Sequence, residues 1–64
     1  MEIYIERTKD TVTYDKPCKA EKLLEELGIN PDTVLIIKNG ETVLPDEDLS
    51  VDDEVKILSV VSGG

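Results

Sequence analysis

The sequence predicts an α+β domain in which one helix packs on one face of a sheet, in the element order β-β-α-β-β-β. Three observations lead to this class. The first residues alternate between apolar and polar, one central segment has helical periodicity, and strand-like runs separated by turn residues follow it. The chain of 64 residues has room for one small hydrophobic core, so we expect a single domain over residues 1–61 and a tail over 62–64.

The first two strands are predicted from the N-terminal residues. Residues 2–7 alternate with period two, which places Ile3 and Ile5 on one face. Residues 11–14 are rich in β-branched and aromatic side chains, which favour strands. Lys9-Asp10 between them has the character of a tight turn, so we expect an N-terminal hairpin.

One amphipathic helix is predicted after Pro17. Its apolar residues recur at i, i+3, i+4 and i+7, as Ala20, Leu23, Leu24 and Leu27. Pro17 near the start and Gly28 just past the end match the usual asymmetry of helix termini. The stripe is therefore expected to face the sheet.

The second half of the chain predicts three strands. Residues 33–38 are nearly all apolar, and Asn39-Gly40 is a strong hairpin signal because a type I′ turn needs positive φ at both positions. Residues 41–44 return as a short strand. Residues 46–50 follow as a loop, which we call the acidic loop, and Leu49 is expected to enter the core from it. Residues 54–61 form the last strand.

Strand parity predicts which side chains face the helix. We expect a core made of Ile3, Ile5, Val12, Leu23, Leu27, Leu49, Val55 and Ile57. The same alternation leaves Leu58 and Val60 on the opposite face as a candidate partner-binding patch, although ordinary exposed strand residues explain them equally well. In residues 34–37, parity leaves open which two side chains face outward.

Composition excludes several function classes. The net charge of −8 argues against nucleic acid as a direct ligand and favours docking onto a basic surface, while plain solvation accounts for it equally well. With no His and one Cys, the chain lacks the residues for a Cys/His zinc site or a His-activated nucleophile, so we expect no catalytic residue and no metal. The absence of a membrane-length apolar run and of a signal peptide predicts a cytoplasmic protein without membrane contact.

Two other groups of residues could form a site. Cys18, beside Lys16 and Lys19 at the predicted helix start, is placed where a thiolate is favoured and sulfur relay is conceivable, but a half-buried structural role is the more common one. The carboxylates of residues 46–48 and 52–54 lack the spacing of a calcium-binding EF-hand, so we expect a solvated acidic loop.

The most informative residues are the last four, Val61-Ser62-Gly63-Gly64. Two glycines allow a thin, conformationally free strand to enter a narrow channel and present its carboxylate. A carboxylate becomes reactive when ATP converts it to an acyl-adenylate. We therefore expect a protein that is itself a substrate at Gly64, although a frayed terminus or an engineered scar also explains two glycines.

Together these residues make the chain similar to the ThiS/MoaD sulfur carriers of the ubiquitin-like β-grasp superfamily. The resemblance covers essentially the whole chain. It rests on the Asn39-Gly40 hairpin and on three segments: Leu23-Leu24-Glu25-Glu26-Leu27-Gly28-Ile29, Asp53-Glu54-Val55-Lys56-Ile57 and Val60-Val61-Ser62-Gly63-Gly64. The family often has Asp-Gly-Asp where this chain has Val51-Asp52-Asp53. The difference concerns the geometry of the turn before the last strand.

The resemblance implies a β-grasp fold and a carrier with no enzymatic activity and no bound cofactor. A ubiquitin-activating-type enzyme would use ATP and magnesium to adenylate Gly64, and sulfur would then give a thiocarboxylate for a sulfur-accepting synthase or thiolase. Gly63 would thread the channel, and Ser62 and Val61 would anchor its entry. The protein would be a monomer. The resemblance also leaves open a ubiquitin-like modifier that joins Gly64 to target lysines.

Overall fold

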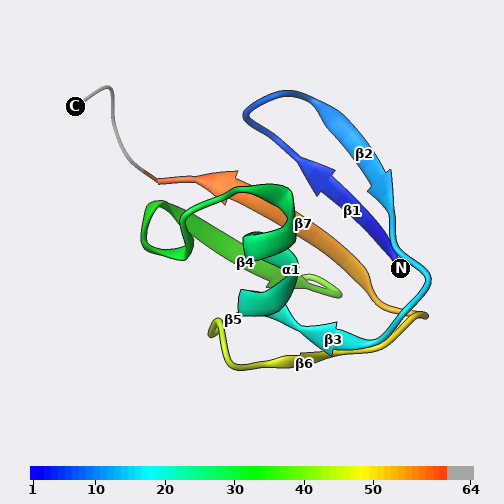
Figure 1. The fold of residues 1–64 in the computed structure, drawn as a ribbon. Helices are drawn as coiled ribbons and strands as arrows, with labels where there is room; N and C mark the ends of the chain where they lie inside the picture. Colours follow the sequence, from blue (N-terminus) through cyan, green and yellow to red (C-terminus); the bar gives the residue numbers. More distant parts are fainter. Residues whose placement is uncertain (61–64) are drawn as a thin grey trace.

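A computed structural model describes residues 1–60 (Figure 1). The main sheet contains β1 (Glu2–Ile5), β2 (Asp10–Thr13), β4 (Val34–Lys38), β5 (Glu41–Val43) and β7 (Glu54–Ser59). A second, two-stranded sheet contains β3 (Cys18–Lys19) and β6 (Asp48–Leu49), and the helical elements are α1 (Ala20–Leu27) and the 3₁₀ turn η1 (Pro31–Thr33).

The five strands are arranged in the order β2-β1-β7-β4-β5. The β1–β7 pair is parallel and the other three pairs are antiparallel. Helix α1 lies across one face of this mixed sheet (Figure 1). The α+β class and the order of the main elements are as predicted, and the arrangement agrees with a β-grasp fold.

The small β3–β6 sheet was not predicted. Cys18 pairs with Leu49, and Lys19 pairs with Asp48, so the segment before the helix is joined to the acidic loop. Two residues are too few to show an alternating pattern. The pairing places Leu49 in the core, as expected, with 1% of its surface exposed.

The helix begins at Ala20, three residues beyond the proline expected near its start. Its first amide groups are bonded by the acidic loop: the Ala20 N–H donates to the Glu47 carbonyl at 2.9 Å, and the Glu21 N–H donates to the Pro45 carbonyl at 2.7 Å. At the other end Gly28 adopts φ 73°, the left-handed conformation that favours glycine at a helix end. The prediction for the helix end is therefore confirmed.

Both hairpin turns have residues with positive φ. Asn39 at 50° and Gly40 at 87° confirm the turn between β4 and β5. The first turn is longer than predicted, because it occupies residues 6–9 and Asp10 already belongs to β2. Lys9 supplies the positive φ there, at 58°.

The core lies between α1 and the sheet. It consists of Met1, Ile3, Ala20, Leu23, Leu24, Ile36, Leu49, Val55 and Ile57. Ile5, Val12 and Leu27, which were also predicted to belong to the core, pack against it but keep part of their surface exposed. The predicted core omitted Met1 and Ile36, and it omitted Ala20 and Leu24 although both lie on the predicted apolar stripe. Parity alone had left the orientation of Ile36 open.

Candidate functional site

The C-terminal segment leaves from the centre of the sheet. Strand β7 lies between β1 and β4, and beyond it the Val60 N–H donates to the Thr33 carbonyl at 3.0 Å. Strand β7 ends at Ser59, two residues before the predicted end. The predictions for Val61, Ser62, Gly63 and Gly64 concern residues outside the part that the structure describes.

Beside this exit, the sheet face that points away from α1 carries apolar side chains. Ile36 and Ile57 are cross-strand partners that face the helix, so their neighbours face the other way. This assigns four residues to what we call the open-face patch: Leu35, Ile37, Leu58 and Val60. Leu35 and Val60 expose 42% and 48% of their surfaces.

The open-face patch is most apolar next to the exit. Leu35 and Leu58 are direct cross-strand partners in β4 and β7. One pair further from the exit, Ile37 lies opposite Lys56, which in turn lies opposite Tyr4 of β1. A partner that takes hold of the C-terminal segment would thus meet an apolar surface first and a charged one beyond it.

The comparison with known families identifies this arrangement. The family model described as the ThiS family matches residues 3–64, which includes the terminal glycines. The chain belongs to the ThiS family. Its members have the ubiquitin-like fold seen here, and this membership supports a general role as a sulfur carrier.

Two relatives agree with the assignment to the ThiS family. The sulfur carrier protein TtuB of Thermus thermophilus is 34% identical over 59 residues, which span 92% of this chain and 88% of that protein. An uncharacterized protein of Archaeoglobus fulgidus is 46% identical over 43 residues, which span 67% of this chain and 63% of that protein.

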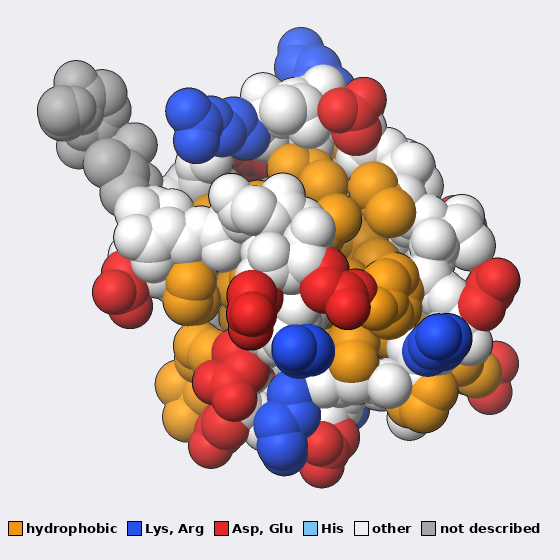
Figure 2. Space-filling model, viewed as in Figure 1, with side chains coloured by type: hydrophobic (Ala, Val, Ile, Leu, Met, Phe, Trp, Pro, Cys, Tyr) orange, Lys and Arg blue, Asp and Glu red, His pale blue; other side chains and the backbone are white. Residues whose placement is uncertain are grey.

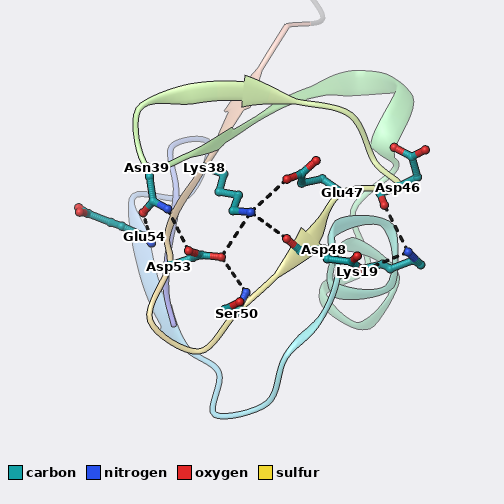
Figure 3. A network of polar contacts seen from close by, with 9 residues as sticks. All are labelled: Lys19, Lys38, Asn39, Asp46, Glu47, Asp48, Ser50, Asp53 and Glu54. Atoms are coloured by element: carbon teal, nitrogen blue, oxygen red, sulfur yellow. Dashed lines mark hydrogen bonds and ion pairs between the residues drawn. The ribbon is translucent and has the colours of Figure 1, made fainter.

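In this ThiS-family chain, the acidic loop has a structural role centred on Lys38 (Figure 3). The Lys38 Nζ donates to a Glu47 carboxylate oxygen and to the Asp48 carbonyl, both at 3.0 Å, and lies 3.7 Å from a carboxylate oxygen of Asp53. The Lys38 side chain is only 23% exposed. These contacts hold the loop against the end of β4, on the helix-facing side of the sheet.

Asp53 joins that loop to the β4–β5 turn. One of its carboxylate oxygens accepts from the Ser50 N–H at 2.7 Å, and the other accepts from the Asn39 amide at 2.9 Å (Figure 3). Both bonds lower the pKa of Asp53, and the bond from Ser50 has the larger effect. Within residues 1–60 no group of side chains is arranged to hold a metal ion. The loop is largely exposed, as expected, and it is also bonded to Lys38 and, through Asp53, to Asn39.

Cys18 has the environment of a structural residue. It is half-buried in β3, and loss of solvent, followed by the negative charge of Glu26, raises the pKa of its thiol. The expectation that the helix start favours a thiolate is wrong, because Cys18 precedes the N-cap residue Lys19 and its surroundings favour the neutral form. Sulfur relay through Cys18 therefore has no support from its environment.

Sequence reasoning located Leu58 and Val60 correctly on the open face but did not select Leu35 and Ile37. The run Val34-Leu35-Ile36-Ile37 is apolar at every position, so only its register against β7 separates the two faces. No helix within residues 1–60 is long and apolar enough to cross a membrane.

Proposed function

We propose that this chain is a sulfur carrier that is activated at the carboxylate of Gly64. The observation that carries the proposal is the family match, which spans nearly the whole chain and continues through the two terminal glycines. The position of the exit supports it, because the last described residues lie beside an exposed apolar surface. The chain would act as a protein co-substrate, and the chemistry would belong to its partner.

The proposed reaction begins in a ubiquitin-activating-type enzyme with ATP and magnesium. A carboxylate oxygen of Gly64 attacks the α-phosphate of ATP and pyrophosphate leaves, giving an acyl-adenylate. The terminal sulfur of a persulfide then attacks the acyl carbon and displaces AMP. A thiol reduces the resulting acyl disulfide, which releases a Gly64 thiocarboxylate and a new disulfide. The thiocarboxylate sulfur then passes to a sulfur-accepting synthase or thiolase for thiazole, molybdopterin or tRNA thiolation.

The open-face patch, the tail and the acidic surface would each have a separate task in that reaction. The open-face patch would dock on the activating enzyme, and Leu58 and Val60 would be buried by it. Gly63 would pass the channel because it lacks a side chain, while Ser62 and Val61 would contact the channel entry. The acidic surface would speed the encounter with a basic partner.

Intact mass spectrometry tests the proposal. The purified chain is incubated with ATP, magnesium, a cognate activating enzyme and a persulfide donor, and we expect the mass gain of one oxygen exchanged for one sulfur. A chain lacking Gly64, and a chain with one residue added after it, should show no gain while they keep the same thermal midpoint. An equal gain in the truncated chain, or no adenylate with any cognate enzyme, would refute the proposal. Lysine peptides carrying a Gly-Gly remnant would instead indicate the protein modifier.

A further inference from the structure

A groove lies on the helix side of the sheet, at the same end of the molecule as the C-terminal exit. Its volume is 660 Å³, and Ser59 at the end of β7 lines it. The floor is the buried Ile57, and the walls are four half-buried residues: Ile5, Leu27, Ile29 and Val34. The groove is thus separate from the open-face patch, which lies on the other face of the sheet.

The groove exists because the core is left uncovered at this end. Helix α1 has eight residues and ends at Leu27, after which residues 28–33 run along one side of the groove without continuing the helix over it. The β3–β6 sheet and the acidic loop lie at the other end of the helix, where they bond its first amides (Figure 1). The C-terminal ends of β1 and β7 therefore extend past the helix, and no helix or strand within residues 1–60 covers their apolar side chains there. This is the reason why Ile5 and Leu27 are only half-buried.

The rim of the groove carries one charge. Arg7, in the turn between β1 and β2, is the charged side chain among the lining residues, and within residues 1–60 it forms no ion pair. Figure 2 shows basic side chains at this turn with hydrophobic side chains below them. A segment that covers the groove takes Arg7 partly out of water, which is costly unless an opposite charge accompanies it.

We propose that this groove binds an extended peptide segment with an apolar residue followed by a carboxylate. The apolar side chain would fill the space between Ile5 and Ile29, and the carboxylate would pair with Arg7. On a chain of net charge −8, an acidic segment is repelled elsewhere, so Arg7 also gives the groove specificity. Because the groove opens at the root of the C-terminal segment, the protein that receives that segment is positioned to supply the peptide. This last identification rests on the proposed function.

Nuclear magnetic resonance titration of the ¹⁵N-labelled full chain tests the groove. The probe is a short capped peptide with two leucines followed by two aspartates. Two control peptides carry lysines in place of the aspartates or serines in place of the leucines. We expect the probe to shift the amides of Ile5, Leu27, Ile29 and Val34, and both controls to shift them much less. Shifts centred on the open-face patch, or none at millimolar probe, would overturn the proposal.

A matched pair of charge reversals tests the role of Arg7. Arg7→Glu and Lys9→Glu change the net charge equally in the same exposed turn, but Lys9 does not line the groove. We expect Arg7→Glu to weaken probe binding at least about fivefold more than Lys9→Glu, because it replaces a local attraction by repulsion. Equal weakening would show that only net charge matters and would refute the assignment. The titration uses no ATP and no enzyme, so its failure is distinguishable from a failure to gain sulfur.

Discussion

Truncation of two leucines one turn apart on helix α1, Leu23 and Leu27, should lower the free energy of unfolding by very different amounts. Leu23 is 0% exposed beneath the helix, whereas Leu27, one turn later, is half-buried at the groove. Leu23→Ala leaves an enclosed cavity and should cost about 2–5 kcal/mol. Leu27→Ala only enlarges a groove that water already reaches, so it loses part of the transfer energy of a leucine, about 1 kcal/mol. The sequence alone had assigned both to the buried face.

The difference is large on the scale of so small a domain. A 64-residue chain is expected to have a free energy of unfolding of roughly 3–10 kcal/mol. Each kcal/mol shifts the thermal midpoint of a domain this size by about 4–8 °C. Guanidinium titration followed by circular dichroism is the suitable assay, because the chain has no Trp for fluorescence. Equal losses from the two variants would mean that the core is closed at the exit end and that the groove is absent.

Three further predictions concern docking and the acidic loop. Leu58→Asp or Val60→Asp should speed dissociation from the activating enzyme, measured by biolayer interferometry, and leave the thermal midpoint nearly unchanged; unaltered dissociation would exclude the open-face patch. Association with that enzyme should slow as the salt concentration rises, because exposed charges are screened beyond about 10 Å at 0.1 M. An association rate that does not depend on salt would mean that the net charge serves solubility and does not steer docking. Folding lowers the pKa of Asp53. The ionised carboxylate therefore stabilises the fold at pH values above the pKa of the unfolded state, and this stabilisation is lost as the pH falls from there through the pKa of the folded state. Asp53→Asn should therefore flatten the loss of unfolding free energy between neutral and acidic pH in denaturant titrations, whereas Asp52→Asn, an exposed neighbour, should not; equal slopes would refute the role of the Asn39 and Ser50 bonds.

The elements that sequence reasoning placed correctly are those with strong local signals. The Leu23 stripe, the end at Gly28 and the Asn39-Gly40 turn each depend on a few neighbouring residues, and all three are present. The β3–β6 pair depends on contacts between residues about thirty positions apart, which no local pattern reports. The faces of Val34-Leu35-Ile36-Ile37 likewise depend on pairing with β7.

In the candidate site, too, features set by neighbouring residues were predictable and features set by the packing of distant elements were not. Parity in β7 was enough to place Leu58 and Val60 on the open face, because Val55 and Ile57 alternate with polar residues. The groove was not predictable, since it follows from the short length of α1 relative to the strands that pass beneath it. Of its lining residues, Ile5, Leu27 and Ile57 had been assigned to the core, whereas Arg7 and Val34 had been assigned to strands.

The central position of β7 has a mechanical consequence. A strand bonded to β1 on one side and β4 on the other, and continued by the Val60 bond to Thr33, is among the last parts of a sheet to open by local fluctuation. Traction on the C-terminal segment along the strand axis loads these bonds together, in shear, instead of peeling them one at a time. If the chain is activated as proposed above, the activating enzyme could draw the segment into its channel under tension while the domain stays folded. Amide hydrogen exchange along β7 should consequently be as slow as global unfolding.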